Sequence, residues 1–577
     1  MATYIRLTDY KDSDSKEQGF FKSENRYEAK QDDFTKIAGI PIAYWLSERV
    51  KTLLIKEKPF DNFSNTTAGI MTGNNEKFVK LWTEFELNKL GLNHKKYEDI
   101  LNFKKKWFPV TRGGEYRKWY GNLESVINLE NNGFDIKNSG KDFRLRDPKY
   151  YFQLGMTWTV GNSKAFSVRE ASIGTIFTRE GQTSFPHEYF YYLIALLNSK
   201  VVISLLQVLS PNDNYSIEHI DKIPTLFPVN ITRDYIENIS KININISKEE
   251  WDSRETSWDF TKNELLKHKS DSKIETAFNN YCSYWKEKFY KLHANEEELN
   301  RFFIDIYELN DELTPDVDLK DITILKSESI INDNNELEFK ADEIMKQFIS
   351  YAVGVMFGRY SIDSDGLVVA NLNQDYPKDT TFEIDDDNVI PVLEDDYFSD
   401  DIASRVINFV KTTFGSESLS ENINFIEKCL GKTIRAYMVK DFYEDHIKRY
   451  KKRPIYWMVS SPKKGFMSLS YMHRYTNDLF ARVQNNYLRE YITKLEGTKD
   501  ILRQIIVDES ASSKDKKDAD KKIKDIENKL KELISFDRDV LTSYAQNRVD
   551  IDLDDGVKVN YNKFKEVLYP IKGLDKE

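Results

Sequence analysis

The pattern of apolar residues changes near residue 230 of this 577-residue chain. Before the change, segments 143–160 and 166–180 are rich in aromatic and β-branched residues, which is typical of strands. The segment 186–210 is the best amphipathic helix of the chain, with Leu and Ile at helical spacing. Helical spacing then dominates from 231 to about 350. This order predicts an α+β multidomain fold in which a mixed α/β unit precedes a largely helical region.

A chain of this length exceeds what one hydrophobic core usually supports, so we expect several units. Apolar spacing in the last hundred residues predicts two antiparallel helices that fold back on each other. Before them, two strand-like segments flank a basic turn. We therefore divide the chain into an N-terminal connector, a mixed α/β domain, a helical region, a mixed α/β unit with an acidic loop and a basic β-turn, and a helical hairpin with a C-terminal tail, at 1–55, 56–230, 231–360, 361–477 and 478–577.

The segment 104–133 concentrates cations, aromatic residues and a glycine pair in a chain whose net charge is −11. Cations neutralise phosphates, arginine binds guanine edges, and aromatic faces stack on displaced bases. Gly113 and Gly114 allow the backbone to turn with positive φ or to approach a ligand closely. One interpretation is a nucleic-acid surface. The other is a surface β-hairpin with half-buried rings and solvated cations, and the segment alone favours neither.

A second basic window, 446–477, contains no Asp or Glu. Within it, His473 lies between tyrosines and beside an arginine, which makes it a candidate phosphate contact. Acidic residues gather instead in 383–401. That run lacks the glycine-centred spacing of an EF-hand, so we expect a solvated acidic loop rather than a cation site.

Several classes of protein are disfavoured by the sequence. No apolar run has the length of a membrane span, and the first residues lack the basic and apolar regions of a secretion signal. The two cysteines, Cys282 and Cys429, exclude a disulfide framework or a thiolate zinc cluster and are typical of a reducing cytoplasm. The sequence also lacks a phosphate loop, a zinc-protease helix and a nucleophile elbow. We expect no membrane partner, no metal site and no autonomous enzyme such as a nuclease.

Three phrases of the mixed unit, at 69–78, 192–200 and 221–224, resemble the target-recognition domain of TaqI-like, type I and type IIG DNA methyltransferases in order and spacing. A wider resemblance covers nearly the whole chain. It is to the part that follows the catalytic domain in the PglX family, the adenine-specific DNA methyltransferases of BREX phage-defence systems. The segments that carry it are 37–50, 105–122, 256–260, 350–361, 452–457, 471–482 and 552–564.

The resemblance implies a protein that marks host DNA at N6 of adenine, uses S-adenosylmethionine and works with other BREX proteins. Such an enzyme needs a glycine-rich cofactor loop and an Asn/Asp-Pro-Pro-Tyr/Phe loop that holds the flipped base. Neither occurs here, and no two prolines are adjacent. We therefore expect 1–55 to connect to a methyltransferase domain that this chain lacks and 56–230 to be the DNA target-recognition domain. No catalytic or cofactor-binding residue is expected, so the chain alone is predicted to be inactive.

The expected partner is double-stranded DNA, with phosphate contacts setting the register and a few side chains contacting bases. In the first window the expected contacts are Lys106, Arg112, Gly113, Gly114, Arg117, Lys118, Trp119 and Tyr120, with Thr72, Asn74 and Asn75 as secondary candidates. A second backbone contact is expected from Lys451, Lys452, Arg453, Lys463, Lys464 and Arg474. The alternative is an assembly or regulatory protein whose helical half docks a methyltransferase catalytic subunit or another BREX component.

Overall fold

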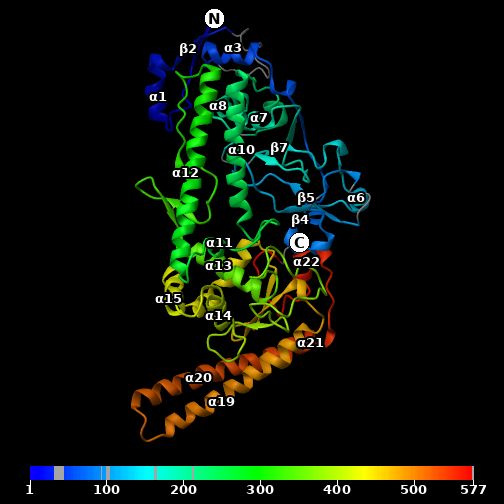
Figure 1. Cartoon of the computed structure of the whole chain (residues 1–577), viewed down its shortest axis with the longest axis vertical. Coiled ribbons are helices and arrows are strands. Elements are labelled where there is room, and N and C mark those ends of the chain that lie inside the picture. Colours follow the sequence, from blue (N-terminus) through cyan, green and yellow to red (C-terminus); the bar gives the residue numbers. More distant parts are fainter. Residues whose placement is uncertain are drawn as a thin grey trace.

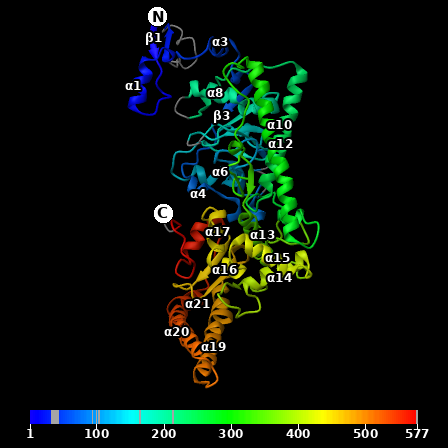
Figure 2. The ribbon, with the colours of Figure 1, turned by 90° about the vertical axis from the view of Figure 1, so that its left-hand side faces the viewer.

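The computed structural model describes residues 1–30, 44–92, 94–98, 100, 104–161, 165–210 and 214–574. The described chain is elongated, with its first strands at one end and a long helical hairpin at the other (Figures 1 and 2). At the first end, β1 (Ala2–Ile5) and β2 (Arg26–Ala29) pair antiparallel around α1 (Ser13–Phe21). Part of the phrase at 37–50 lies outside the described residues, and α3 (Glu48–Lys56) follows it.

Two four-stranded sheets form the mixed part. The first has the order β3-β10-β7-β8 with antiparallel neighbours, and its strands are β3 (Ser64–Thr67), β7 (Gly155–Trp158), β8 (Val168–Ala171) and β10 (Thr183–Pro186). The second has the order β4-β6-β5-β9, and its strands are β4 (Val79–Leu81), β5 (Trp107–Thr111), β6 (Ser125–Asn128) and β9 (Ile176–Phe177). In it, β5 and β9 run parallel while the other neighbours are antiparallel.

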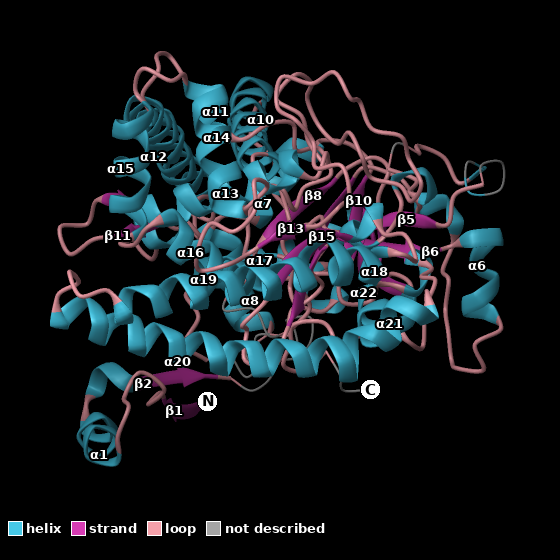
Figure 3. Cartoon of the chain, turned by 90° about the horizontal axis from the view of Figure 1, so that it is seen from below, coloured by secondary structure: helices cyan, strands magenta, loops and turns pink. Residues whose placement is uncertain are grey.

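Helices cover one side of these sheets. Next to β8 lies α7 (Phe190–Leu197), and α8 (Lys200–Leu209) packs on α7, with Ser199 capping α8 by accepting from the backbone of Val202. The long helices α10 (Asn230–Asp252) and α12 (Ile274–Tyr307) pack against α7 and α8, and Figure 3 shows α10 and α12 together on one side of the strands β5, β8 and β10. No single described helix is long and apolar enough to cross a membrane; α7 and α8 reach the required length and apolar character only together, with a 63° bend.

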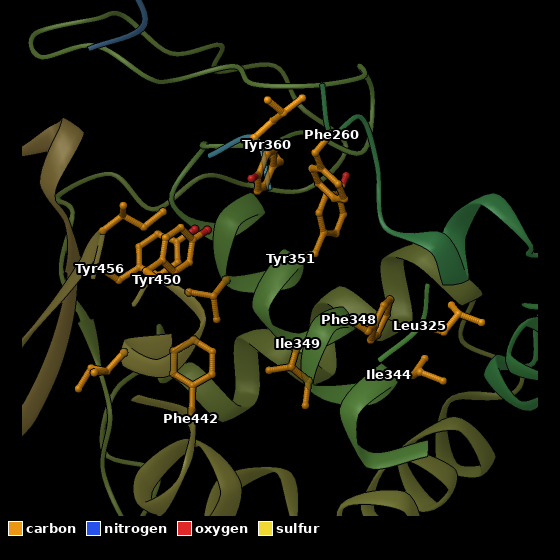
Figure 4. Packing of buried hydrophobic residues seen from close by; sticks show 14 of the residues in the cluster. Phe260, Leu325, Ile344, Phe348, Ile349, Tyr351, Tyr360, Phe442, Tyr450 and Tyr456 are labelled. Atoms are coloured by element: carbon orange, nitrogen blue, oxygen red, sulfur yellow. The ribbon is translucent and has the colours of Figure 1, made fainter. Parts of the chain in front are cut away.

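Beyond the long helices, a three-stranded sheet has the order β13-β15-β14. Its strands are β13 (Ile390–Pro391), β14 (Tyr456–Ser460) and β15 (Met467–Tyr471), and the predicted basic turn joins β14 to β15. Around it lie α13 (Ala341–Met356), α14 (Ile402–Phe414), α15 (Leu419–Leu430), α16 (Ile434–Lys440) and α17 (Phe442–Arg449). Figure 4 shows α13 at the centre of this packing, where Phe348 and Tyr351 lie among aromatic residues from distant segments.

The smaller elements of the chain connect these layers. Those that precede α13 in the chain are α4 (Asn75–Phe78), α6 (Glu130–Lys137), α9 (Ile217–Ile220), α11 (Glu264–Lys267), β11 (Ser329–Ile331) and β12 (Leu337–Phe339). At the other end, α19 (Arg489–Val507) and α20 (Ser513–Phe536) form the predicted helical hairpin, flanked by α18 (Leu479–Arg482), α21 (Thr542–Asn547) and α22 (Val557–Asn562).

The α+β fold class is confirmed by this arrangement. The largest hydrophobic cluster extends from Val50 to Leu574 and includes residues of all five expected units. Smaller clusters lie within the sheet β4-β6-β5-β9. The units are therefore packed through shared apolar surface, and their expected boundaries stay predictions.

Candidate nucleic-acid interface

A cleft of about 1310 Å³ lies between the sheet β4-β6-β5-β9 and the segment 552–562. Residues of the loop 112–115 and of the segment 449–453 complete its walls. In Figure 1, α22 lies next to β4 at the C-terminal end of the chain. The cleft therefore brings both basic windows and the C-terminal tail to one place, although they are far apart in sequence.

Asp554 fastens the tail to the sheet. Its carboxylate lies 3.0 Å from Lys89 Nζ and 3.1 Å from Lys106 Nζ, and it accepts a hydrogen bond from the Trp107 indole at 3.3 Å. Burial raises the pKa of Asp554, but the two ammonium groups outweigh it and the net pKa is lowered. Lys106 thus lines the cleft, with its charge already opposed by Asp554, and its expected DNA contact stays a prediction.

Cations and carboxylates both line the cleft, but most of the carboxylates are held in ion pairs. Glu76 lies 2.5 Å from Lys558, and Glu124 pairs with Lys451. Within the described part of the chain, four lining cations have no carboxylate within 4.0 Å, namely Lys77, Lys80, Arg112 and Arg453. These are the groups best able to bind an incoming anion.

Lys80 is a candidate contact that the sequence did not indicate, because it is a lone lysine on a short strand outside both windows. Burial lowers the pKa of its ammonium group, Glu84 raises it, and Arg453 and Lys558 lower it again, for a net lowering. Its Nζ donates to the carbonyl oxygen of Asp555 at 3.3 Å. A half-buried ammonium crowded by other cations is stabilised by a phosphate brought against it.

The glycine turn after β5 has the backbone conformation that its sequence predicted. Gly113 has a φ of +80° and Gly114 a φ of +120°, and both line the cleft beside the exposed Arg112. Of the secondary candidates, Asn74 is exposed in the cleft, and Asn75 lines a neighbouring pocket of about 180 Å³.

Thr72 does not fit the expectation of a DNA contact, because its side chain is fully buried. Its hydroxyl donates to Asn75 Oδ1 at 2.7 Å and accepts from the Asn74 backbone at 3.1 Å. Thr72 therefore fixes the loop that presents the two asparagines.

The second part of the first window contradicts the expectation of DNA contact, because it is buried against the long helices. Lys118, Trp119 and Tyr120 are 5 %, 1 % and 3 % exposed. Lys118 Nζ lies 2.7 Å from Glu296 of α12, and the Trp119 indole donates to the same carboxylate at 2.8 Å. Burial lowers the pKa of Lys118, but Glu296 outweighs it and the net pKa is raised.

Arg117 is held in the same way and is likewise unavailable to DNA. Its guanidinium lies 2.5 Å from Glu250 of α10, donates to the Tyr120 carbonyl at 2.6 Å, and lies 5.0 Å from the ring of Trp251. Burial raises the pKa of Glu250, whereas Arg117 and Arg254 lower it, to about 2. Residues 117–120 are therefore neither a nucleic-acid surface nor a solvated hairpin but an anchor to the helices.

Strand β14 separates the cations of the second window into two groups that do not meet at the cleft, and the expected DNA contacts of Lys463 and Lys464 stay predictions. Lys451 and Arg453 line the cleft, whereas the exposed Lys452 donates to the Lys572 carbonyl at 3.1 Å. Lys463 and Lys464 lie at the other end of β14, about 16 Å away for five extended residues. Lys464 also donates to the Tyr569 hydroxyl at 2.8 Å.

Arg474 and His473 are turned into the protein, which contradicts their expected phosphate contacts. Arg474 donates to the carbonyl oxygens of Asp385 at 2.7 Å and Asp386 at 3.1 Å. His473 is buried, and its Nε2 lies 2.8 Å from the Phe85 carbonyl oxygen. Burial and the nearby Arg359 lower the pKa of His473 to about 3, so the ring stays neutral.

The acidic run is only partly the solvated loop that its composition predicted. Asp401 is buried, caps α14 and lies 2.8 Å from Arg435, and Asp385 is 4 % exposed. Burial and the Asp387 carboxylate raise the pKa of Asp385 to about 7, against Arg405 and Arg474, which lower it. Within the residues that the structure covers, no group of three or more His, Cys, Asp or Glu is placed to hold a metal ion.

No family model matches the chain. Adenine-specific methyltransferase PglX of Lacticaseibacillus casei (strain Zhang) is 36% identical over 611 residues, which cover 99% of this chain and 49% of that protein. Adenine-specific methyltransferase BrxX of Escherichia coli O9:H4 (strain HS) is 34% identical over 576 residues, which cover 94% of this chain and 46% of that protein. The resemblance to this group of methyltransferases is thus supported along nearly the full chain, which spans about half the length of the curated relatives it matches.

Proposed function

We propose that this chain is the DNA-binding specificity portion of an adenine-specific (N6) DNA methyltransferase of the BREX type, and that it selects the site at which host DNA is modified for phage defence. The proposal proceeds from the similarity to two proteins named adenine-specific methyltransferases. The observation that carries the DNA-binding part is the convergence of Lys77, Lys80, Arg112 and Arg453 on one cleft without paired carboxylates.

Duplex DNA is the ligand that these four cations suit. Phosphates lie along the duplex at regular spacing, and binding releases their counterions, so several separate cations contribute together. Phosphate contacts of this kind set position and register without reading sequence. The half-buried ion pairs of Asp554 keep the tail against the sheet, so both walls of the cleft are held in place before DNA arrives.

Methyl transfer belongs to residues outside this chain in this proposal. The complete enzyme uses S-adenosylmethionine as methyl donor, together with a loop that holds the extruded adenine. Neither the cofactor loop nor the adjacent prolines of the base-holding loop occurs in the sequence, so this chain is proposed to supply no residue to the methyl-transfer step. The proposed partners are therefore double-stranded DNA, a methyltransferase catalytic domain or subunit, and other BREX proteins.

The test is duplex binding by the purified chain as a function of salt. We expect binding at low salt that weakens linearly on a log–log plot, with a slope of about 0.9 per phosphate contact. The double variant Lys77→Ala/Arg453→Ala is expected to bind about tenfold more weakly and to lose about two contacts from the slope. The matched control is Lys291→Ala/Arg301→Ala, two exposed cations on α12, which should bind like the unsubstituted chain. Absence of binding at low salt, or binding insensitive to salt, defeats the proposal.

The helical hairpin favours a second, assembly role. Both ribbon views show α19 and α20 extending away from the body (Figures 1 and 2), and Ile501 and Val507 are 62 % and 76 % exposed near the tip. Exposed apolar side chains on a projecting helix are typical of a docking surface. Replacing Ile501 and Val507 with Ser should weaken co-purification with a catalytic subunit or another BREX protein while duplex binding is unchanged; unchanged co-purification would remove this role.

A further inference from the structure

Three parallel chain segments end at one edge of the sheet β4-β6-β5-β9. β5 pairs parallel with β9, and Ile70 forms a parallel bridge with Thr178 on the other side of β9. The loops that leave these segments are 72–75, 112–115 and 179–181. Because parallel strands point the same way, their following loops meet at the same edge, which is where open α/β sheets bind ligands.

Glycines hold two of these loops in direct contact. A Cβ on Gly181 would lie 2.9 Å from the backbone nitrogen of Gly113, and a Cβ on Gly113 would lie 3.0 Å from the carbonyl oxygen of Glu180. Thr72 fixes the third loop, whose Asn75 amide donates to the Glu180 carboxylate at 3.3 Å. The three loops therefore form one rigid edge rather than three independent surface turns.

The side chains on this edge differ in kind from those on the cleft wall. Arg179 is exposed and, within the described part of the chain, has no side-chain partner, while Glu180 and Asn74 are also exposed. A carboxylate at this position repels phosphate, whereas it accepts from the amino group of cytosine. Arginine donates to guanine, and an asparagine amide pairs with adenine. Donors and acceptors side by side suit base edges, whereas the unpaired cations of the cleft suit phosphates.

We propose that Arg179 and Glu180, together with Asn74, are specificity-determining residues that contact base edges of duplex DNA held in the cleft. This proposal rests on the proposed DNA-binding function and adds that two groups of residues have different roles. The unpaired cations of the cleft supply affinity that is independent of sequence, and the residues of the sheet edge select the sequence. Arg179 and Glu180 lie outside both basic windows, and the signal that would have found them is their place directly after a strand, like Arg112 after β5.

The experiment is selection of bound duplexes from a pool with a randomised central segment, at constant salt, using the full chain. Arg179→Ala and Glu180→Gln are compared with Arg301→Ala and Glu338→Gln, an exposed arginine and an exposed glutamate on other elements. Each edge variant is expected to change the preferred base at individual positions and to bind the selected site about 5- to 150-fold more weakly. Its affinity for a scrambled duplex and its salt slope should stay as in the unsubstituted chain, and equal melting temperatures establish that each variant is folded.

Each outcome bears on a different claim. If the unsubstituted chain binds no duplex, the proposed function fails and the edge assignment fails with it. If it binds but selects no sequence, or if Arg179→Ala and Glu180→Gln select the same sequence as the unsubstituted chain, the edge assignment is overturned while DNA binding stands. An equal loss of affinity for selected and scrambled duplexes would make the edge a phosphate contact and would also overturn the assignment.

Discussion

Arg112 and Lys118 lie six residues apart in the same basic, aromatic segment, yet they occupy opposite environments. Arg112 is exposed in the cleft, and no carboxylate among the described residues lies within 4.0 Å of it. Lys118 is buried on Glu296. The second window repeats this division, with Arg453 in the cleft and Arg474 against the carbonyls of the acidic run. The same residue types are thus exposed or buried according to whether a distant segment supplies a partner.

The largest effect is expected at the anchor. Lys118→Ala leaves the Glu296 carboxylate buried and unpaired, which should lower the free energy of unfolding by about 3–5 kcal/mol. Denaturant unfolding of the purified chain measures it. The double variant Lys118→Met/Glu296→Gln removes both charges, keeps an oxygen that accepts from the Trp119 indole, and should recover most of that loss. A Lys118→Ala chain as stable as the original that binds DNA more weakly would reverse the assignment of anchor and interface.

Arg112→Ala should show the opposite profile. The side chain is exposed and unpaired, so stability should change by less than about 0.5 kcal/mol. Affinity for duplex DNA should fall about five- to tenfold, because one charged contact is lost. Fluorescence anisotropy with a labelled duplex measures the affinity. If Arg112→Ala binds like the unsubstituted chain, the exposed part of the first window has no role at the interface.

Asp385, whose carbonyl accepts from Arg474, makes the stability of the fold depend on pH. Because its folded pKa is raised, the unfolded chain loses this proton first as pH rises, so the residue reduces stability progressively between about pH 4 and pH 7. Asp385→Asn should therefore raise the free energy of unfolding by about 1–2 kcal/mol at pH 8 and leave it nearly unchanged at pH 4. Thermal unfolding at the two pH values measures this; a stabilisation that is equal at both would exclude titration of Asp385 as its cause.

The smallest effect is expected at the distant turn. Lys463→Ala/Lys464→Ala removes two cations that the structure separates from the cleft by the length of β14, so duplex affinity should change by less than about twofold. A tenfold loss, measured in the same anisotropy assay, would extend the DNA path beyond the cleft and along this hairpin.

The sequence predicted the features that depend on residues close to each other in the chain. The α+β class, the helical hairpin and the glycine turn follow from apolar spacing and backbone freedom, and each is present. The partners of residues 117–120 were not predictable, because Glu250 lies 133 residues from Arg117 and Glu296 lies 178 residues from Lys118. Composition identified the segments that gather cations, whereas their exposure depended on tertiary contacts that a single sequence does not display.

The position of the segment 552–562 at the cleft has a consequence for biosynthesis. The backbone of Val557 donates to Glu84 at 2.8 Å across 473 residues of sequence. Ribosomes add roughly 5–20 residues per second, so Glu84 waits on the order of 20–90 s for this partner to be made. A chain interrupted before residue 557 contains the sheet and its loops but lacks most of the segment that forms the opposite side of the cleft. The cleft is therefore completed last, and ribosomes that abort early release products without it.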